Sequence, residues 1–379
     1  MTDRGDGEMR KRRTKSAPRA AASRGSTGVR FGALTFAGLA DVTRRELAPL
    51  RASGLSTFRL RNHDLIVGRI DGRHVPRLAR LQTAEDIFSM LGEPVPVKGQ
   101  HDLASLNALL TKARILNALG QKQALGGTRR RRAPTFTCFV KQDRDRQVRR
   151  KSIAGSVTAR VASIFPKWRS ADPAEVEFWG FYVGQMLHLG LRLSDEKMKY
   201  RGRTPQRRKG ALRPTIAGAM AVLADPKAGS LVVDPMCGTG TVLEEAFRRQ
   251  REARYAGGDS SEEAVHLARE RLAAYGIAIQ RWDARKLPLD EHEVDCIVCN
   301  LPFGKGYSTP EENPALYRAL VSHWRGKLKP GGRMVLLTAD SSAMEACLRG
   351  SGLSWREECR AKVLGTWATV YSVENAPRS

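Results

Sequence analysis

The sequence of 379 residues predicts an α/β protein with a parallel, helix-covered sheet in residues 213–379. Three observations lead to this prediction. After residue 213, short apolar runs such as SLVVD and VDCIVCN alternate with helical patterns, as in a parallel sheet whose faces are covered. The final stretch, WREECRAKVLGTWATVYSVE, holds two strand patterns with no room for a helix, which predicts an antiparallel edge hairpin. The preceding residues mix strands and helices in α+β order.

The first half predicts two α+β units. In residues 30–98, a strand over VRFGALTF is followed by a helix with Asp41 as its N-cap, a hairpin over STFRLRNHDLIVGRID and a second helix over RLARLQTAEDIFSMLG. This order is ferredoxin-like in outline. In residues 99–195, TFTCFVKQ predicts a strand, RKSIAGSVTARVASIF a helix, and AEVEFWGFYVGQMLHLGLRLS a pair of strands.

The balance of charge predicts a polyanionic partner. Lys and Arg number 65 against 39 Asp and Glu, a formal net charge of +26. Such a field attracts nucleic acid first and an anionic membrane surface second. No run of about 18 apolar residues predicts a membrane span, and the N-terminus lacks the apolar core of a secretion signal. We therefore expect a cytoplasmic protein that binds nucleic acid and not membranes, and we also expect a monomer.

The basic residues are concentrated in polar segments. Residues 1–29 form an Arg-rich tail that we expect to be disordered. Residues 196–212 form a basic linker, before a helix over RPTIAGAMAVLAD that has Pro214 at its first position. The candidate RNA-binding residues are Arg149, Arg150, Lys151, Arg201, Arg203, Arg207, Arg208, Lys209 and Lys305.

The cysteines predict neither a disulfide framework nor a metal site. The six cysteines are scattered, and only Cys296 and Cys299 form a C-x-x-C pair. A zinc knuckle needs a second ligand pair nearby, which the sequence lacks. Because the pair lies within a β-branched apolar run, we expect two buried strand cysteines and no metal.

Polar residues stand at the predicted carboxyl ends of four strands, where open α/β sheets bind their ligands. Asp234 ends the first of these strands, and Asp259 ends the second, placed to accept bonds from ribose hydroxyls. Asp283 ends the third and suits an exocyclic amine such as adenine N6, and Asn300 ends the fourth. Two neighbours, Ser260 and Ala284, are further candidates for cofactor binding.

The turn after Asp234 limits which classes of ligand the site can bind. It reads DPMCGTGT, in which Gly238 and Gly240 shape the entry to the next helix. A dinucleotide fold would show G-x-G-x-x-G here, and a P-loop would show Lys followed by Ser or Thr. Neither pattern is present, so a nucleoside without a pyrophosphate fits better. S-adenosylmethionine meets that description.

The segment Asn300-Leu301-Pro302-Phe303 predicts amine methylation. The lone pair of an exocyclic amine on guanine or adenine is delocalised into the ring. If the Asn300 Oδ1 atom and the Leu301 carbonyl accept its two N–H bonds, the nitrogen becomes more tetrahedral and its lone pair can face a methyl group. Pro302 orients the backbone, and Phe303 stacks on a base flipped out of its helix. Catalysis then depends on positioning and electrostatics.

The motifs DPMCGTGTVLEEA, LRPTIAGAMAVLA and NLPFGK together resemble the THUMP-domain class of S-adenosylmethionine-dependent RNA methyltransferases, closest to its tRNA guanine-N2 members. The resemblance implies a ferredoxin-like domain over 30–98, a THUMP RNA-binding domain over 99–195, and a Rossmann-like class I methyltransferase domain with a seven-stranded sheet over 213–379. It also implies that Asp234, Gly238 and Gly240 shape the methionine pocket and that Thr215 closes it.

The family implies methylation of a guanine N2 in the tRNA acceptor stem, often at position 6. The tetrapeptide NLPF replaces the NPPY or DPPY of many amino-methyltransferases, so the motif leaves guanine N2 and adenine N6 both open. The remaining alternatives are an rRNA substrate, a DNA amino-methyltransferase, and an inactive RNA-binding protein of the same fold.

Overall fold

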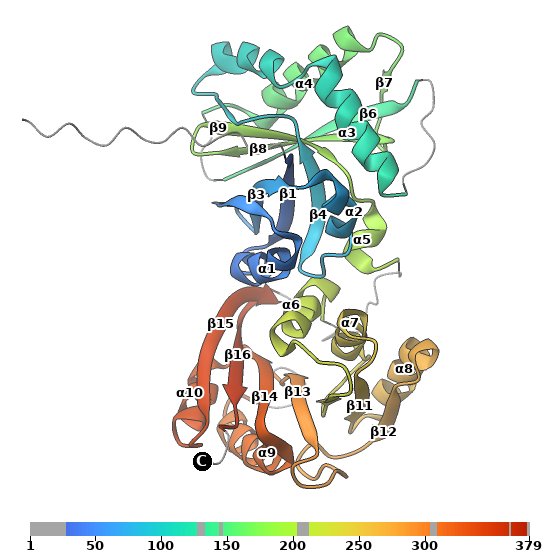
Figure 1. Ribbon diagram of the computed structural model, residues 1–379. Helices are drawn as coiled ribbons and strands as arrows, with labels where there is room; N and C mark the ends of the chain where they lie inside the picture. Colours follow the sequence, from blue (N-terminus) through green and yellow to red (C-terminus); the bar gives the residue numbers. More distant parts are fainter. Residues whose placement is uncertain are drawn as a thin grey trace, which may run out of the picture.

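A computed structural model describes residues 28–126, 133–143, 147–202, 212–303, 309–363 and 365–376. These residues form two lobes, each built on one sheet, and the helices α1 and α6 lie where the lobes meet (Figure 1). The predicted basic tail lies almost wholly outside the described ranges, so its state stays a prediction. No helix in these ranges is long and apolar enough to cross a bilayer.

The first lobe is built on one continuous mixed sheet in the order β2-β3-β1-β4-β9-β8-β6-β7, with β5 beside β9. β4 and β9 run antiparallel, with Phe88 opposite Arg192 and Met90 opposite Gly190. The two predicted N-terminal units therefore share a sheet and a core across the boundary expected near residue 98. The strands are β1 (Val29–Phe36), β2 (Ser53–Arg59), β3 (His63–Ile70), β4 (Ala84–Met90), β5 (Val95–Pro96), β6 (Thr135–Gln142), β7 (Arg169–Ser170), β8 (Val176–Val183) and β9 (Met186–Arg192).

Two sequence predictions for this lobe are wrong. The second helix expected over residues 77–92 is only α2 (Val75–Leu78), and β4 follows it. Every residue of β4 is buried, because the strand lies between β1 and β9 with both faces covered, so it lacks the alternation that identifies a strand. The expected N-cap, Asp41, lies in the first turn of α1 (Ala40–Leu47), whose N-cap is Leu39.

The other helices of this lobe lie against the same sheet. They are α3 (Lys112–Ala124), α4 (Arg150–Ile164) and α5 (Glu196–Tyr200), and short 3-10 helices cover Ala48–Leu50, Gly72–His74 and Gln100–Ala108. With α1 and α2, the first unit has the strand-helix-strand-strand-helix-strand order of a ferredoxin-like fold.

The second lobe contains a seven-stranded sheet in the order β12-β11-β10-β13-β14-β16-β15. The first five strands are parallel, and β16 pairs antiparallel with β14 and β15, so the predicted edge hairpin is confirmed. The strand order reverses between β10 and β13, the place where open α/β sheets bind ligands. The strands are β10 (Leu231–Asp234), β11 (Arg254–Asp259), β12 (Ala278–Arg281), β13 (Val294–Asn300), β14 (Leu328–Thr338), β15 (Ser354–Val363) and β16 (Thr366–Glu374).

Helices cover both faces of this sheet. On one face the apolar side chains of β13, Cys296 and Val298, pack with α6, α7 and α8; on the other, Ile297 and Cys299 pack with α9 and α10. The C-x-x-C pair is thus divided between two cores, as expected of buried strand cysteines. The helices are α6 (Pro214–Ala224), α7 (Thr241–Arg249), α8 (Glu262–Leu272), α9 (Asn313–Lys327) and α10 (Ser341–Arg349), and a 3-10 helix covers Ala273–Tyr275.

The two lobes contact each other closely through glycines and a buried ion pair. A Cβ on Gly38 would lie 1.9 Å from the Arg360 carbonyl oxygen, and one on Gly218 would lie 2.6 Å from the Gln82 carbonyl oxygen. The Gln82 amide donates to the Glu245 side chain at 3.0 Å, and the Arg201 guanidinium donates to the same carboxylate at 3.1 Å. The lobes are therefore held in one arrangement.

Candidate active site

The ends of β10 and β11 are joined by the turn that follows Asp234. The Cys237 N–H donates to the Gly258 carbonyl at 2.9 Å, and the Gly238 N–H donates to Asp259 Oδ2 at 3.0 Å. Gly238 has φ +52 with no atom within 4 Å of where a Cβ would lie, whereas a Cβ on Gly240 (φ +77) would lie 2.8 Å from Leu272. Gly238 therefore keeps the site open, and Gly240 lets α8 pack close.

Asp259 is held in place by the backbone. Its Oδ1 atom accepts from the Ser261 N–H at 2.9 Å, while Oδ2 accepts from Gly238. Each carboxylate oxygen has a second lone pair, so the group can still accept bonds from a ligand. The side chain of the neighbouring Ser260 is exposed.

Asp234 is almost completely buried, with 1% exposed. Burial, together with the nearby charge of Asp259, raises the pKa of Asp234 to about 8, although a bond from the Met236 N–H lowers it. Burial of this kind at a strand end is typical of functional sites.

Asp283 forms a salt bridge with Arg285. The Arg285 guanidinium donates to both of its carboxylate oxygens, with 2.8 Å between Nη2 and Oδ2, and these bonds lower the pKa of Asp283. An adenine amine would have to donate to the carboxylate lone pairs of Asp283 that do not accept from Arg285. Ala284 is buried, and its carbonyl accepts from the Trp324 indole at 2.8 Å.

Trp282 is a site residue that the sequence analysis missed. Its indole N–H donates to the Pro235 carbonyl at 3.1 Å, and its ring lies over Gly258, where a Cβ would be 1.9 Å from Nε1. The ring therefore borders the turn between Asp234 and Asp259. The adjacent glycines 257 and 258 at the end of β11 were the available signal, because paired strand glycines mark a close approach.

Hydrogen bonds to neighbouring elements hold the Asn300–Phe303 segment in place. The Leu301 N–H donates to the Leu337 carbonyl at 2.9 Å, and the Pro302 carbonyl accepts from the Tyr317 hydroxyl at 2.7 Å. That hydroxyl also lies 2.7 Å from Thr338 Oγ1. The Pro302 carbonyl is therefore turned into the protein.

Among the buried polar atoms that lack a hydrogen-bond partner in the described residues, two belong to predicted site residues: Asn300 Oδ1 and Thr215 Oγ1. An unpaired buried acceptor lowers the stability of the fold by about 1–3 kcal/mol. A ligand that donates an N–H to Asn300 Oδ1 would remove this cost. Beside Phe303 lies a cavity of about 590 Å³, which we call the Phe303 cavity. Its lining residues are Phe303, Pro310, Asn313, Pro314, Ala339, Asp340, Ser342, Ala343, Ala346 and Thr366.

We expect Tyr317→Phe to lower kcat by about fivefold, since one hydrogen bond that positions Pro302 is worth about 1 kcal/mol. The KM for RNA and the Kd for the methyl donor should stay near the wild-type values. Single-turnover kinetics and calorimetry measure these quantities. Tyr275→Phe, which removes a bond of 3.2 Å to Glu244, is the matched control. An unchanged kcat in the Tyr317 variant would show that this hydroxyl does not position the segment.

The predicted RNA-binding residues have different outcomes. Arg149, Arg150 and Lys151 are exposed at the start of α4. Arg201 is mostly buried, with 10% of its side chain exposed, and its guanidinium bonds to Glu245 across the lobe contact. The structure thus gives Arg201 a different role from the expected RNA contact. The remaining candidates, Arg203, Arg207, Arg208, Lys209 and Lys305, lie outside the described residues.

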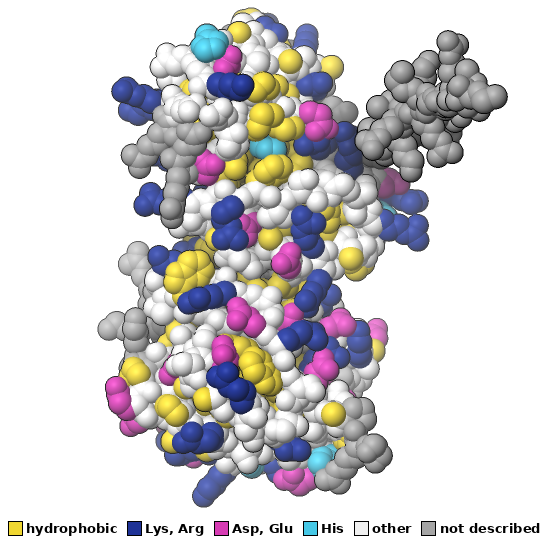
Figure 2. Space-filling model, turned by 90° about the vertical axis from the view of Figure 1, so that its left-hand side faces the viewer, with side chains coloured by type: hydrophobic (Ala, Val, Ile, Leu, Met, Phe, Trp, Pro, Cys, Tyr) yellow, Lys and Arg dark blue, Asp and Glu magenta, His cyan; other side chains and the backbone are white. Residues whose placement is uncertain are grey.

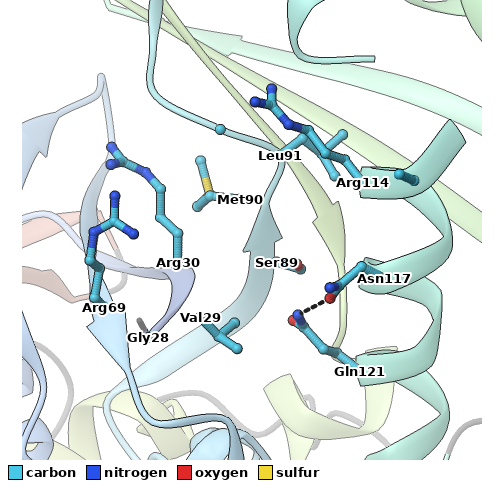
Figure 3. A pocket seen from close by; sticks show the side chains of 12 residues that line it. Gly28, Val29, Arg30, Arg69, Ser89, Met90, Leu91, Arg114, Asn117 and Gln121 are labelled. Atoms are coloured by element: carbon cyan, nitrogen blue, oxygen red, sulfur yellow. Dashed lines mark hydrogen bonds between the residues drawn. The ribbon is translucent and has the colours of Figure 1, made fainter. Parts of the chain in front are cut away.

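The first lobe also has a basic cavity that the sequence analysis did not predict. Arg30 and Arg69 border it from neighbouring strands and Arg114 from α3, around a volume of about 440 Å³ (Figure 3). Both Arg30 and Arg69 pair with Glu93, so the three guanidinium groups leave an excess of positive charge. On the face shown in Figure 2, Lys and Arg side chains are spread over both lobes.

The fold and the site together define a class. A seven-stranded sheet with an antiparallel terminal hairpin, acids at the ends of β10 and β11, and an unpaired Asn300 after β13 describe a Rossmann-like methyltransferase. In the described residues, no group of three or more His, Cys, Asp or Glu is arranged to hold a metal.

Comparison with known proteins supports this class. Residues 201–369 match the family model described as UPF0020: RMKL-like, methyltransferase domain. The chain is 31% identical over 209 residues to the tRNA (guanine(6)-N(2))-methyltransferase THUMP3 of Bos taurus, covering 50% of this chain and 41% of that protein. It is 37% identical over 133 residues to the U6 snRNA (guanine-N(2))-methyltransferase THUMPD2 of Bos taurus, covering 34% of this chain and 26% of that protein.

Among solved structures, TrmN from Thermus thermophilus has a TM-score of 0.71 at 24% identity, covering 92% of this chain and 99% of that chain. The shared fold therefore extends over both lobes. The alignments with the two curated relatives cover less than half of those proteins' lengths. The match over residues 201–369 confirms the resemblance to methyltransferases seen in the sequence.

The residues present fit S-adenosylmethionine, the methyl donor expected from the sequence. Gly238 leaves open space at the turn, and Asp259 keeps lone pairs for ribose hydroxyls. The Thr215 hydroxyl, which the sequence assigns to the same ligand, is buried and has no hydrogen-bond partner among the described residues. These features are located where the strand order reverses.

Proposed function

We propose that the protein methylates the exocyclic N2 amine of a guanine in tRNA, in the acceptor stem and at position 6. The observation that carries the proposal is the buried, unpaired Asn300 Oδ1 atom at the end of β13, three residues before Phe303, which lines a cavity. Both curated relatives described above are named as guanine-N2 methyltransferases, which supports the N2 amine of guanine as the methylated group. We also propose that the protein acts in the cytoplasm and as a monomer.

The chain's own residues would act by positioning. Asn300 Oδ1 and the Leu301 carbonyl accept the two N–H bonds of the amine, which directs its lone pair out of the ring plane. The bond from Tyr317 to the Pro302 carbonyl holds this segment in place, and Phe303 stacks on the flipped base. Asp259 and Thr215 would hold S-adenosylmethionine, which would supply an electrophilic methyl group. The methylated amine would then release its proton to water.

Three alternatives follow from the same site. An rRNA guanine would present the same amine, and adenine N6 could be held by the same two acceptors. An inactive RNA-binding protein would keep the fold and lose the chemistry. The intact Asp234, Asp259 and Asn300 favour an active enzyme.

The test is to incubate total tRNA and deproteinised rRNA separately with the protein and labelled S-adenosylmethionine, and to digest them to nucleosides. We expect labelled N2-methylguanosine from tRNA. Label found only in rRNA would show that rRNA, and not tRNA, is the substrate. Label found in N6-methyladenosine would show that the target is adenine N6 and not guanine N2. Absence of cofactor binding in calorimetry would favour the inactive protein.

RNA affinity should fall steeply with salt, because each neutralised phosphate contributes a slope of about −0.7 to −0.9 in log K against log salt. If Arg114 contacts a phosphate, Arg114→Ala lowers the absolute slope by about one such unit. Filter binding from low to physiological salt measures this slope. Arg356→Ala, in the edge hairpin of the other lobe, is the control. An unchanged slope for Arg114→Ala would remove the basic cavity from the RNA interface.

A further inference from the structure

The Phe303 cavity has one acidic residue among the described residues that line it, Asp340. Asp340 follows β14 and is the N-cap of α10. Its Oδ1 atom accepts from the Ala343 N–H at 3.1 Å and from the Ser342 hydroxyl at 3.0 Å. Its Oδ2 atom accepts from the Asn313 amide at 3.1 Å. Partial burial raises the pKa of Asp340, but these bonds outweigh it and leave the pKa below its ordinary value.

Asp340 is tied to the segment that holds the target amine. Its N–H donates to Thr338 Oγ1 at 3.0 Å, and that oxygen lies 2.7 Å from the Tyr317 hydroxyl, which donates to the Pro302 carbonyl. One hydrogen-bonded network therefore joins the cap of α10 to Pro302. Because Phe303 and Asp340 line the same cavity, a base that stacks on Phe303 would meet this carboxylate.

The bases differ at the edge that such a carboxylate would meet. Next to its amine, guanine carries the N1–H donor, whereas adenine carries an N1 lone pair. An ionised carboxylate only accepts hydrogen bonds. It would therefore stabilise guanine and repel the N1 atom of adenine. Asn300 and Leu301 accept from an amine and cannot make this distinction.

We propose that Asp340 determines the specificity of the enzyme for guanine, by accepting the N1–H of the target base. This inference rests on the proposed function, since it assigns a further role within the same site. A site built to bond a substrate N–H leaves its own polar groups unpaired when that N–H is missing, which gives strong discrimination.

The test compares two RNAs that differ at one base. The guanine that the wild-type enzyme methylates is replaced by 2-aminopurine, which keeps the N2 amine and has an N1 lone pair in place of N1–H. We expect the wild-type enzyme to prefer guanine by at least about tenfold in kcat/KM, the worth of one bond to a charged group. In Asp340→Asn this preference should fall by about 10- to 100-fold, since the Asn amide can donate to the N1 atom of 2-aminopurine.

Asn is as good an N-cap as Asp, so this variant keeps the cap of α10. Asp340→Ser, which also caps, is the second variant if the first does not fold. Asp71→Asn, at the cap of an exposed 3-10 helix, is the matched control and should keep the wild-type preference. An equal loss on both bases would show that Asp340 is only a structural cap and would overturn the inference. If the wild-type enzyme forms no N2-methylguanosine, the proposed function itself has failed.

Discussion

Asn300→Ala should lower kcat by about 100- to 1000-fold, the usual cost of losing one preorganised polar group at the reacting atom. Asn300 Oδ1 is buried without a partner in the described residues, so it is free to accept from the target amine. The Kd for S-adenosylmethionine should stay near the wild-type value, because other residues hold that ligand. Single-turnover methylation and calorimetry measure the two quantities.

For the same variant, Asn300→Ala, we expect no loss of stability. Removal of an unpaired buried acceptor relieves a desolvation cost, so the Tm of the apo protein should not fall. Asn117→Ala, on the exposed surface of α3, is the control for loss of an amide. A large loss of cofactor binding in the Asn300 variant would contradict the role we assign, and a large fall in Tm would indicate that Asn300 is structural.

Asp259→Ala should raise the Kd for S-adenosylmethionine by about 10- to 100-fold, since hydrogen bonds to a charged group contribute about 1.5–3 kcal/mol. The carboxylate both accepts from the ligand and anchors the turn through the N–H groups of Gly238 and Ser261. Asp259→Asn keeps one acceptor and should lose less. Calorimetric titration with S-adenosylmethionine measures each value.

The exposed Asp290→Ala provides the control for loss of an acid near the same sheet. We expect kcat at saturating cofactor to fall less than affinity in Asp259→Ala. The assignment would be wrong if the variant bound S-adenosylmethionine as tightly as the wild-type protein.

The second lobe was predictable because its strands are short apolar runs that each end in a polar residue. Asp234, Asp259 and Asn300 follow three neighbouring strands, so a parallel sheet had to bring them to one edge. The reversal of strand order followed from the fold class. Local pattern and topology led to the same site.

The remaining site residues depend on contacts that no local pattern contains. Tyr317 and Asp340 are separated along the chain from the Pro302 carbonyl, and only the packing of α9 and β14 joins them. Arg201 was one of several basic residues in a polar linker, and its pairing with Glu245 depends on how the lobes meet. Strand β4 was missed because a strand buried on both faces lacks an alternating pattern.

The pairing of β4 with β9 has a consequence for how residues 28–195 unfold. A fragment that ended near residue 98 would leave β4 with an open edge, and the complementary fragment would leave β9 in the same state. Open apolar edges recruit other chains, so each fragment alone should aggregate. We therefore expect this half of the protein to melt as a single cooperative unit, and limited proteolysis to release no stable piece that ends at this position.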